Sequence, residues 1–283
     1  MKVPVFKLHD GTEVPQIGFG TAGIRGSEGT EAIVHALNSG YRYLDSAYNY
    51  ENEATVGKAI KESGVERSEI LVASKLPGRY HQRKDALTAI EEGLYRSGLD
   101  YFDIYLIHWP NPIQDHYLEA WQTLLEARDK GLIRHVGVSN FLPEHIDRLI
   151  AETGEKPVLN QIEQHPYFQQ ADQRAYHEKH GILTQSWSPL GRYNTKFETP
   201  VAELPAITEL AEKYDRTPAQ IVLRWHIQLG SMPIPKSSTP KRQKENLDVF
   251  GFELSEDDVA RIAEYDRPDG RNKDQDPAVY EEF

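Results

Sequence analysis

The chain contains the stretch Asp103-Ile104-Tyr105-Leu106-Ile107-His108-Trp109-Pro110, in which an apolar run ends in a histidine and a proline. Proline lacks the backbone N–H that a central strand needs, so a strand built from the apolar run must end before Pro110. A histidine at a strand end can be purely structural. It can also be functional, because barrel enzymes carry their reactive residues at the carboxyl ends of parallel strands.

Two other short apolar runs end in polar side chains. Val72-Ala73-Ser74-Lys75 ends in a lysine, and Tyr43-Leu44-Asp45 ends in a carboxylate a few residues before Tyr50. The carboxyl ends of parallel strands gather at one end of a barrel. We therefore expect Asp45, Tyr50, Lys75 and His108 to lie close together.

Short apolar runs alternate with amphipathic, helix-like stretches along the chain, and this alternation predicts an α/β fold with a parallel sheet. Repeated strand–helix units favour a closed (β/α)8 TIM barrel over an open sheet, and 283 residues suit one such barrel with its loops. A hairpin around Asp10-Gly11 is expected at the bottom of the barrel. No linker interrupts the sequence, so residues 1–283 are expected to form a single domain. The expected strands lie near residues 17–20, 42–45, 70–75, 103–108, 133–138, 158–162, 182–187 and 232–235.

One helix can be placed from its first residues. Thr217-Pro218-Ala219-Gln220 offers a hydroxyl to cap the helix, a proline at the first helical position and a glutamine three residues after the cap. This pattern predicts a helix from about residue 218 to residue 229.

An open dinucleotide-binding sheet is the alternative fold. Gly18-Phe19-Gly20-Thr21-Ala22-Gly23 has the G-x-G-x-x-G spacing that holds a pyrophosphate after a first strand. Here, however, the stretch follows a hairpin, and further residues including Gly26 precede any helix. Only Asp45 follows as an acidic residue at a strand end, so the barrel is the preferred reading.

The composition excludes several classes of partner and site. A formal net charge of −12 argues against a nucleic-acid groove or binding to an anionic membrane. The absence of cysteine excludes disulfides, thiolate zinc sites and cysteine nucleophiles. The first residues do not form a signal peptide, and no segment is apolar enough to span a membrane. These features predict a cytoplasmic protein without a bound metal, and nothing in the sequence demands more than a monomer.

The four strand-end residues suit proton transfer to a carbonyl. A tyrosine hydroxyl has an ordinary pKa of about 10, and a nearby lysine ammonium would lower that value. Asp45 would keep Lys75 charged, and His108 would orient the incoming oxygen. The alternatives are an ordinary ion pair of Lys75 with Asp45 and a Tyr50 that merely precedes a helix.

The chain resembles the aldo-keto reductases along nearly its whole length. The first signature of that family is similar to residues 40–53, from Gly40-Tyr41-Arg42 to Asn52-Glu53. Further motifs follow in the family's order: Ser74-Lys75-Leu76, Leu106-Ile107-His108-Trp109-Pro110, Gly137-Val138-Ser139-Asn140-Phe141, residues 160–166, Ser188-Pro189-Leu190-Gly191 and Ile234-Pro235-Lys236-Ser237. The resemblance implies a barrel that reduces small aldehydes, ketones or dicarbonyls with NADPH. It assigns proton donation to Tyr50, tuning to Lys75 and Asp45, and substrate orientation to His108.

The resemblance also implies how NADPH is bound. Ser139, Asn140 and Gln161 match positions that bind the nicotinamide amide, and Trp187 matches an aromatic ring that lies against the nicotinamide. Thr239 is expected to cap a short helix that begins at Pro240, whose start would bind the adenosine 2′-phosphate. A solvated basic patch is the alternative for that region. The full set of expected cofactor residues is Ser139, Asn140, Gln161, Trp187, Ser188, Leu190, Lys236, Ser237, Ser238, Arg242 and Asn246.

The substrate is less well defined. The likeness is strongest to the bacterial branch that contains 2,5-diketo-D-gluconate reductases, and both that dicarbonyl and methylglyoxal are candidate substrates. Tyr48, Trp109, His108 and Arg192 are expected to line an open, polar pocket, partly because the chain after Asp266 is brief and charged. Two other classes stay open: a regulatory barrel that binds NADPH without turnover, as in potassium-channel β subunits, and a metal-dependent hydrolase.

Overall fold

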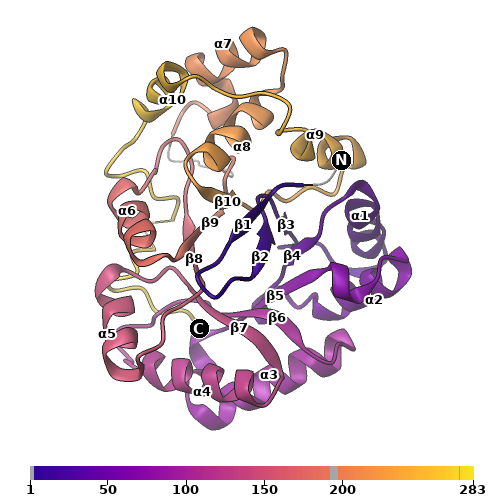
Figure 1. The fold of residues 1–283 in the computed structure, drawn as a ribbon, viewed down its shortest axis with the longest axis vertical. Coiled ribbons are helices and arrows are strands. Elements are labelled where there is room, and N and C mark those ends of the chain that lie inside the picture. Colours follow the sequence, from indigo (N-terminus) through magenta and orange to yellow (C-terminus); the bar gives the residue numbers. More distant parts are fainter. Residues whose placement is uncertain (1–2, 192–196, 274) are drawn as a thin grey trace.

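The parallel sheet forms the centre of the protein. The computed structural model describes residues 3–191, 197–273 and 275–283. Neighbouring strands pair in chain order from β3 to β10, and helices surround them (Figure 1). The strands are β3 (Phe19–Gly20), β4 (Tyr43–Asp45), β5 (Leu71–Leu76), β6 (Phe102–Ile107), β7 (Ile133–Ser139), β8 (Leu159–Glu163), β9 (Leu183–Trp187) and β10 (Ser231–Pro233). The predicted strands and their parallel order are therefore confirmed, with ends shifted by one or two residues.

The first and last strands of the sheet meet and close the barrel. The Gly18 N–H donates to the Pro233 carbonyl at 3.0 Å, and the Gly20 N–H donates to the Pro235 carbonyl at 3.1 Å. A Cβ at Gly20 would lie 2.8 Å from the Ile234 carbonyl oxygen. The open-sheet alternative is therefore wrong, because these glycines allow close backbone approach at the barrel seam rather than around a pyrophosphate.

The helices form the outer layer of the barrel. The predicted helix at 218–229 is confirmed as α8, which ends at Gln228. The Thr217 hydroxyl accepts a hydrogen bond from the Gln220 N–H, and the Gln220 side chain accepts one from the Thr217 N–H. The helices are α1 (Gly26–Ser39), α2 (Glu53–Ser63), α3 (Arg83–Ser97), α4 (Tyr117–Asp129), α5 (Pro143–Thr153), α6 (Ala171–His180), α7 (Pro205–Tyr214), α8 (Pro218–Gln228), α9 (Pro240–Leu247) and α10 (Glu256–Ala263).

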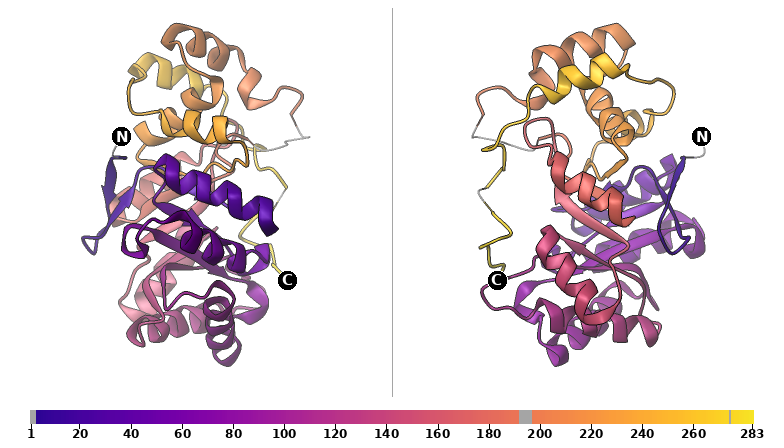
Figure 2. Two further views of the ribbon diagram at one scale, coloured as in Figure 1. Left: turned by 90° about the vertical axis from the view of Figure 1, so that its right-hand side faces the viewer. Right: turned by 60° about the vertical axis from the view of Figure 1, so that its left-hand side comes forward.

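The predicted hairpin lies at the amino-terminal end of the barrel strands. Strands β1 (Val5–Lys7) and β2 (Glu13–Pro15) pair antiparallel. The side chains of Leu8 and Val14 are buried in one cluster with barrel residues. Asp10 contacts His135, near the start of β7, at 2.8 Å. Figure 2 shows this hairpin on one side of the barrel and the last residues of the chain on the opposite side.

The apolar core has the two layers that a barrel requires. One cluster fills the barrel interior, and a larger one lies between strands and helices. A third cluster joins helices α7, α8 and α10. In the described part of the chain, no helix combines the length and apolarity that crossing a membrane would require.

Candidate active site

Asp45 and Lys75 form a buried ion pair at the carboxyl ends of β4 and β5. The Lys75 ammonium lies 2.8 Å from Asp45 Oδ2 and also donates to the Ser46 carbonyl at 2.7 Å. Both side chains are almost fully buried. Burial alone would lower the pKa of Lys75, but Asp45 and Tyr50 together outweigh burial and raise that pKa above its ordinary value. Lys75 is therefore held as a fixed cation.

Tyr50 lies beside this cation, at the end of the short 3-10 turn Tyr48–Tyr50 that follows β4. The Lys75 nitrogen is 5.0 Å from the centre of the Tyr50 ring. Burial raises the pKa of the Tyr50 hydroxyl, and the opposing effect of the Lys75 charge does not cancel it. Lys75 acts to lower this pKa, as expected, but the net shift is upward because desolvation of the hydroxyl is the larger effect. Tyr50 is held in its protonated form.

His108 follows β6 directly and completes the cluster. Its ring centre lies 6.1 Å from that of Tyr50, and the two rings meet nearly edge to face. His108 Nδ1 lies 2.7 Å from Glu282 Oε1. The Glu282 carboxylate thus lies against the His108 ring, although Nδ1 has no aligned hydrogen-bond partner among the described residues. The structure therefore brings Asp45, Tyr50, Lys75 and His108 together, as the sequence predicts.

Glu282 is a residue of this site that sequence reasoning missed. Its Oε1 accepts a hydrogen bond from Asn49 Nδ2 at 2.9 Å, and its Oε2 accepts one from the Gly78 N–H at 3.1 Å. Its backbone exchanges two hydrogen bonds with the Asn111 side chain, at 2.8 and 3.0 Å. These contacts join positions far apart in sequence, and the polar segment around Glu282 carries no local signal for them.

The same segment covers Trp109, one of the expected lining residues. The Tyr280 ring lies 4.5 Å from the Trp109 ring, centre to centre, and Trp109 is buried. Tyr48, in contrast, has its ring contacts with Tyr80, Arg79 and Arg96 among the described residues. The structure therefore places His108 and Trp109 next to each other beneath the last segment and does not join Tyr48 to them. Arg192 lies outside the described residues.

The expected nicotinamide residues form one hydrogen-bonded network at the ends of β7, β8 and β9. Asn140, in a left-handed conformation with φ of 62°, donates to the His108 carbonyl at 3.0 Å and accepts from Trp187 Nε1 at 2.8 Å. Ser139 donates to the Gln161 carbonyl at 2.9 Å, and Gln161 donates to Asp45 at 2.7 Å. The network links these positions to the Asp45–Lys75 pair. Because its members satisfy one another, their burial does not by itself demand a bound ligand.

The expected phosphate-binding residues surround the start of α9, which begins at Pro240 as predicted. Thr239 makes no side-chain hydrogen bond to the helix, so the expected cap is wrong; the Thr239 N–H instead donates to Ser237 Oγ at 3.1 Å. Ser237 and Asn246 are buried, whereas Lys236, Ser238 and Arg242 are exposed. Within the described ranges, neither Lys236 nor Arg242 has a carboxylate partner. Ser188 and Leu190, just past β9, are partly buried.

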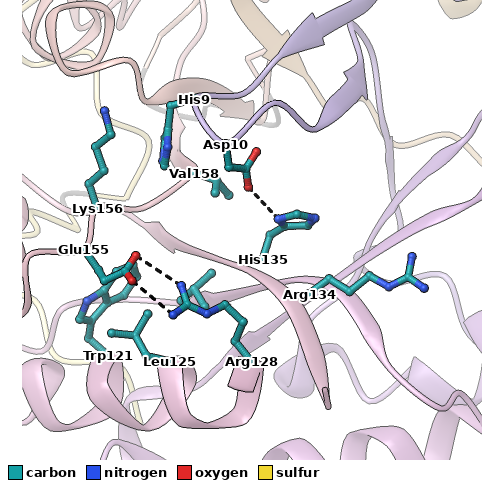
Figure 3. Close-up of a pocket in the computed structure, with 11 residues that line it drawn as sticks. His9, Asp10, Trp121, Leu125, Arg128, Arg134, His135, Glu155, Lys156 and Val158 are labelled. Atoms are coloured by element: carbon teal, nitrogen blue, oxygen red, sulfur yellow. Dashed lines mark hydrogen bonds and ion pairs between the residues drawn. The ribbon is translucent and has the colours of Figure 1, made fainter. Parts of the chain in front are cut away.

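A cleft lies at the amino-terminal end of the barrel, beneath the hairpin (Figure 3). Its charged side chains are largely paired with one another. Asp10 contacts His135 at 2.8 Å, and Arg128 contacts Glu155 at 3.3 Å. Polar contacts at this end of a barrel are typical of stability rather than catalysis. The described residues contain no group of His, Asp and Glu side chains that could hold a metal ion.

Comparison with known proteins agrees with this arrangement. The profile of the aldo/keto reductase family matches residues 16–267. The chain is 51% identical over 281 residues to 2,5-diketo-D-gluconic acid reductase B from Corynebacterium sp. (strain SHS752001), and the matched region covers 99% of both chains. It is 45% identical over 273 residues to methylglyoxal reductase DkgA from Escherichia coli (strain K12), covering 96% of both. A solved structure of a Bombyx mori aldo-keto reductase in complex with NADP superposes with a TM-score of 0.91 and 36% identity, covering 100% of this chain and 99% of the other. The chain is therefore a member of the aldo/keto reductase family.

Proposed function

We propose that this protein reduces small aldehydes, ketones or dicarbonyls to alcohols with NADPH. The observation that carries the proposal is the buried Asp45–Lys75 pair, which lies beside the Tyr50 ring, with the His108 ring also next to that of Tyr50. A fixed cation next to a protonated phenol suits proton donation to an oxygen that gains negative charge. Membership of the aldo/keto reductase family supports the same chemistry.

Each of the four residues has a distinct role in this proposal. Tyr50 donates its proton to the carbonyl oxygen of the substrate. Lys75 stabilises the phenolate that remains, and Asp45 keeps Lys75 charged and fixed at 2.8 Å. His108 orients the carbonyl oxygen toward Tyr50. NADPH supplies the hydride that reaches the carbonyl carbon.

The described residues fit this cofactor at both of its ends. Trp187 is partly exposed and its ring is fixed by the hydrogen bond to Asn140, so it offers a rigid aromatic face beside Ser139, Asn140 and Gln161. At the other end, the first N–H groups of α9 lack a side-chain cap, and Lys236 and Arg242 are exposed cations. Together they suit a phosphate, because helix starts and guanidinium groups both favour anions. Ser188, Leu190, Ser237, Ser238 and Asn246 complete the proposed site.

The substrate is proposed to be a small dicarbonyl such as 2,5-diketo-D-gluconate or methylglyoxal. The two relatives named for reductases of these compounds are 51% and 45% identical to this chain. His108 and Trp109 are proposed to contact it, with Tyr48 further out. We also propose that the protein acts as a single-domain monomer, because all of the proposed catalytic residues come from one chain. A cytoplasmic location suits an enzyme that consumes NADPH, and no nucleic acid or membrane partner is proposed.

The test follows NADPH absorbance with purified protein and a panel of small carbonyls. We expect turnover in the native protein and loss of at least about a hundredfold in kcat for Tyr50→Phe, since general acid catalysis contributes about that much or more. Tyr95→Phe is the matched control, because Tyr95 is exposed on helix α3. Full activity in Tyr50→Phe would show that the proton comes from elsewhere. NADPH binding without turnover across the panel would favour the regulatory reading.

A further inference from the structure

Glu282 places a fixed negative charge beside His108 in the proposed active site. The side chain is 7% exposed, and three donors or charges surround it: His108 Nδ1 at 2.7 Å, Asn49 Nδ2 at 2.9 Å and the Gly78 N–H at 3.1 Å. Each of these contacts favours the carboxylate over the neutral acid. The pKa of Glu282 is accordingly lowered: burial raises it, but His108 and the hydrogen bonds outweigh burial.

The backbone around Glu282 is held so that alternate side chains face the site. Tyr280 lies against Trp109, and Glu282 lies against His108. Between them, Glu281 accepts a hydrogen bond from the Ile113 N–H at 2.7 Å. Val279 and Phe283 are largely exposed. The hydrogen bonds between the Glu282 backbone and Asn111 fix the register, so a substitution at the Glu282 side chain leaves this attachment in place.

Cations near Glu282 are already engaged with other groups. Lys75 is paired with Asp45. Arg79 donates to the Phe283 carbonyl at 3.0 Å and lies over the rings of Tyr48 and Tyr80. Burial lowers the pKa of the neighbouring His81 to about 4, so this ring is neutral at pH 7. Among the described residues, neither Lys75 nor Arg79 forms an ion pair with Glu282, whose carboxylate lies directly against the His108 ring.

We infer that Glu282 is a specificity-determining residue that makes the site favour uncharged carbonyl substrates over anionic ones. The inference rests on the proposed function. A carbonyl oxygen held by His108 would lie within about 8 Å of the Glu282 carboxylate, which is no more than one Debye length at physiological salt. Of the substrates named for the two relatives, methylglyoxal is uncharged and 2,5-diketo-D-gluconate is an anion. Glu282 therefore predicts a preference for the methylglyoxal type.

The test uses two aldehydes of the same shape that differ in charge: methyl 4-formylbenzoate, which is neutral, and 4-formylbenzoate, which is an anion. kcat/KM for NADPH-dependent reduction of each is measured in the native protein, in Glu282→Gln and in Glu281→Gln. Glu281→Gln is the matched control, because it removes the same charge from the same segment, but at a side chain that accepts a hydrogen bond from the Ile113 N–H instead of contacting His108. (4-Formylphenyl)trimethylammonium serves as the cationic probe.

In the native protein we expect kcat/KM for the neutral ester to exceed that for the acid by about tenfold or more, given the strength of like-charge repulsion at a partly buried site. Glu282→Gln should reduce this ratio by about tenfold and weaken any preference for the cationic aldehyde, while Glu281→Gln should leave both nearly unchanged. An ester-to-acid ratio equal in all three proteins would overturn the inference while leaving the proposed function intact. Failure of the native protein to reduce even the neutral ester or methylglyoxal would count against the proposed function itself.

Discussion

Removing the charge of Asp45 is expected to destabilise the folded protein and to reduce its reductase activity. Asp45 accepts hydrogen bonds from two buried donors, Lys75 Nζ at 2.8 Å and Gln161 Nε2 at 2.7 Å. Asparagine offers only one acceptor oxygen, and its amide would direct N–H groups at one of these donors. Asp45→Asn therefore leaves a buried ammonium without its counter-charge.

The size of the effect follows from the burial of the pair. The two side chains are 0% and 3% exposed, and breaking a buried pair by removing one partner costs about 3–5 kcal/mol. An exposed pair provides the contrast. Lys58 and Glu62 lie 3.7 Å apart with side chains 62% and 52% exposed, and such a pair contributes about 0.3–0.5 kcal/mol. Glu62→Gln should thus be nearly silent.

Urea unfolding at pH 7 measures both variants, and NADPH consumption measures their activity. A third variant, Asp45→Asn with Lys75→Met, separates loss of the pair from the cost of an orphaned charge. Because it removes the unpaired ammonium, the double variant should be more stable than Asp45→Asn alone by about 1–3 kcal/mol. If Asp45→Asn costs less than about 1 kcal/mol, or if the second substitution destabilises further, the reasoning from desolvation is wrong.

Four further outcomes are expected. The pKa of Tyr50 lies above its ordinary value of 10.0, so Tyr50 stays protonated and its ionisation should not limit the rate of carbonyl reduction between pH 6 and 9. The rate of the reverse reaction, alcohol oxidation, should rise with pH. A reduction rate that falls with a single ionisation near pH 7, assigned to Tyr50, would contradict this. Gly20→Ala should cost about 1–3 kcal/mol in urea unfolding, because its Cβ would meet the Ile234 carbonyl. Thr217→Ala should lower the free energy of unfolding by about 1 kcal/mol through loss of the cap hydrogen bond from the Gln220 N–H. A thermal unfolding midpoint equal to that of the native protein would refute this. Finally, lowering the pH from 7 to 5 should reduce the free energy of unfolding by about 2 kcal/mol for each histidine held neutral by burial. The reason is that the unfolded chain binds protons at these histidines below pH 6.5, whereas the folded chain does not. A free energy of unfolding that stays constant from pH 7 to 5 would contradict this. These histidines, with pKa values of about 4, 3 and 3, are His81, His177 and His226.

The strands and the clustering of the four proposed catalytic residues could be predicted from sequence because the signals are local. Each strand is a short apolar run, and the residue at its carboxyl end is fixed by the run itself. The register then aligns the ends: Asp45 pairs with Ala73 on the next strand, and Lys75 pairs with Leu106 on the strand after that. Once the fold is a parallel barrel, residues that end neighbouring strands meet without further information.

Two features were beyond such reasoning for a physical reason. The pKa of Tyr50 depends on the balance between burial and the Lys75 charge, and burial is a property of the folded chain. The position of Glu282 depends on hydrogen bonds to Asn49, Gly78 and Asn111, which are separated from it by 171 or more residues. Neither the pKa of Tyr50 nor the position of Glu282 can be inferred from a short sequence motif.

The contacts of Glu282 also explain why Gly78 lacks a side chain. A Cβ at Gly78 would lie 2.2 Å from Asn111 Nδ2, so any larger residue would displace the amide that holds the Glu282 backbone. The Gly78 N–H in turn donates to the Glu282 carboxylate. A glycine after β5, an asparagine after β6 and a glutamate near the end of the chain are thus one unit, and its geometry sets the charge beside His108. Under the two proposals, the preference for substrate charge would be set by the segment around Glu282 and the loops that hold it, while proton transfer would depend on the strand ends themselves.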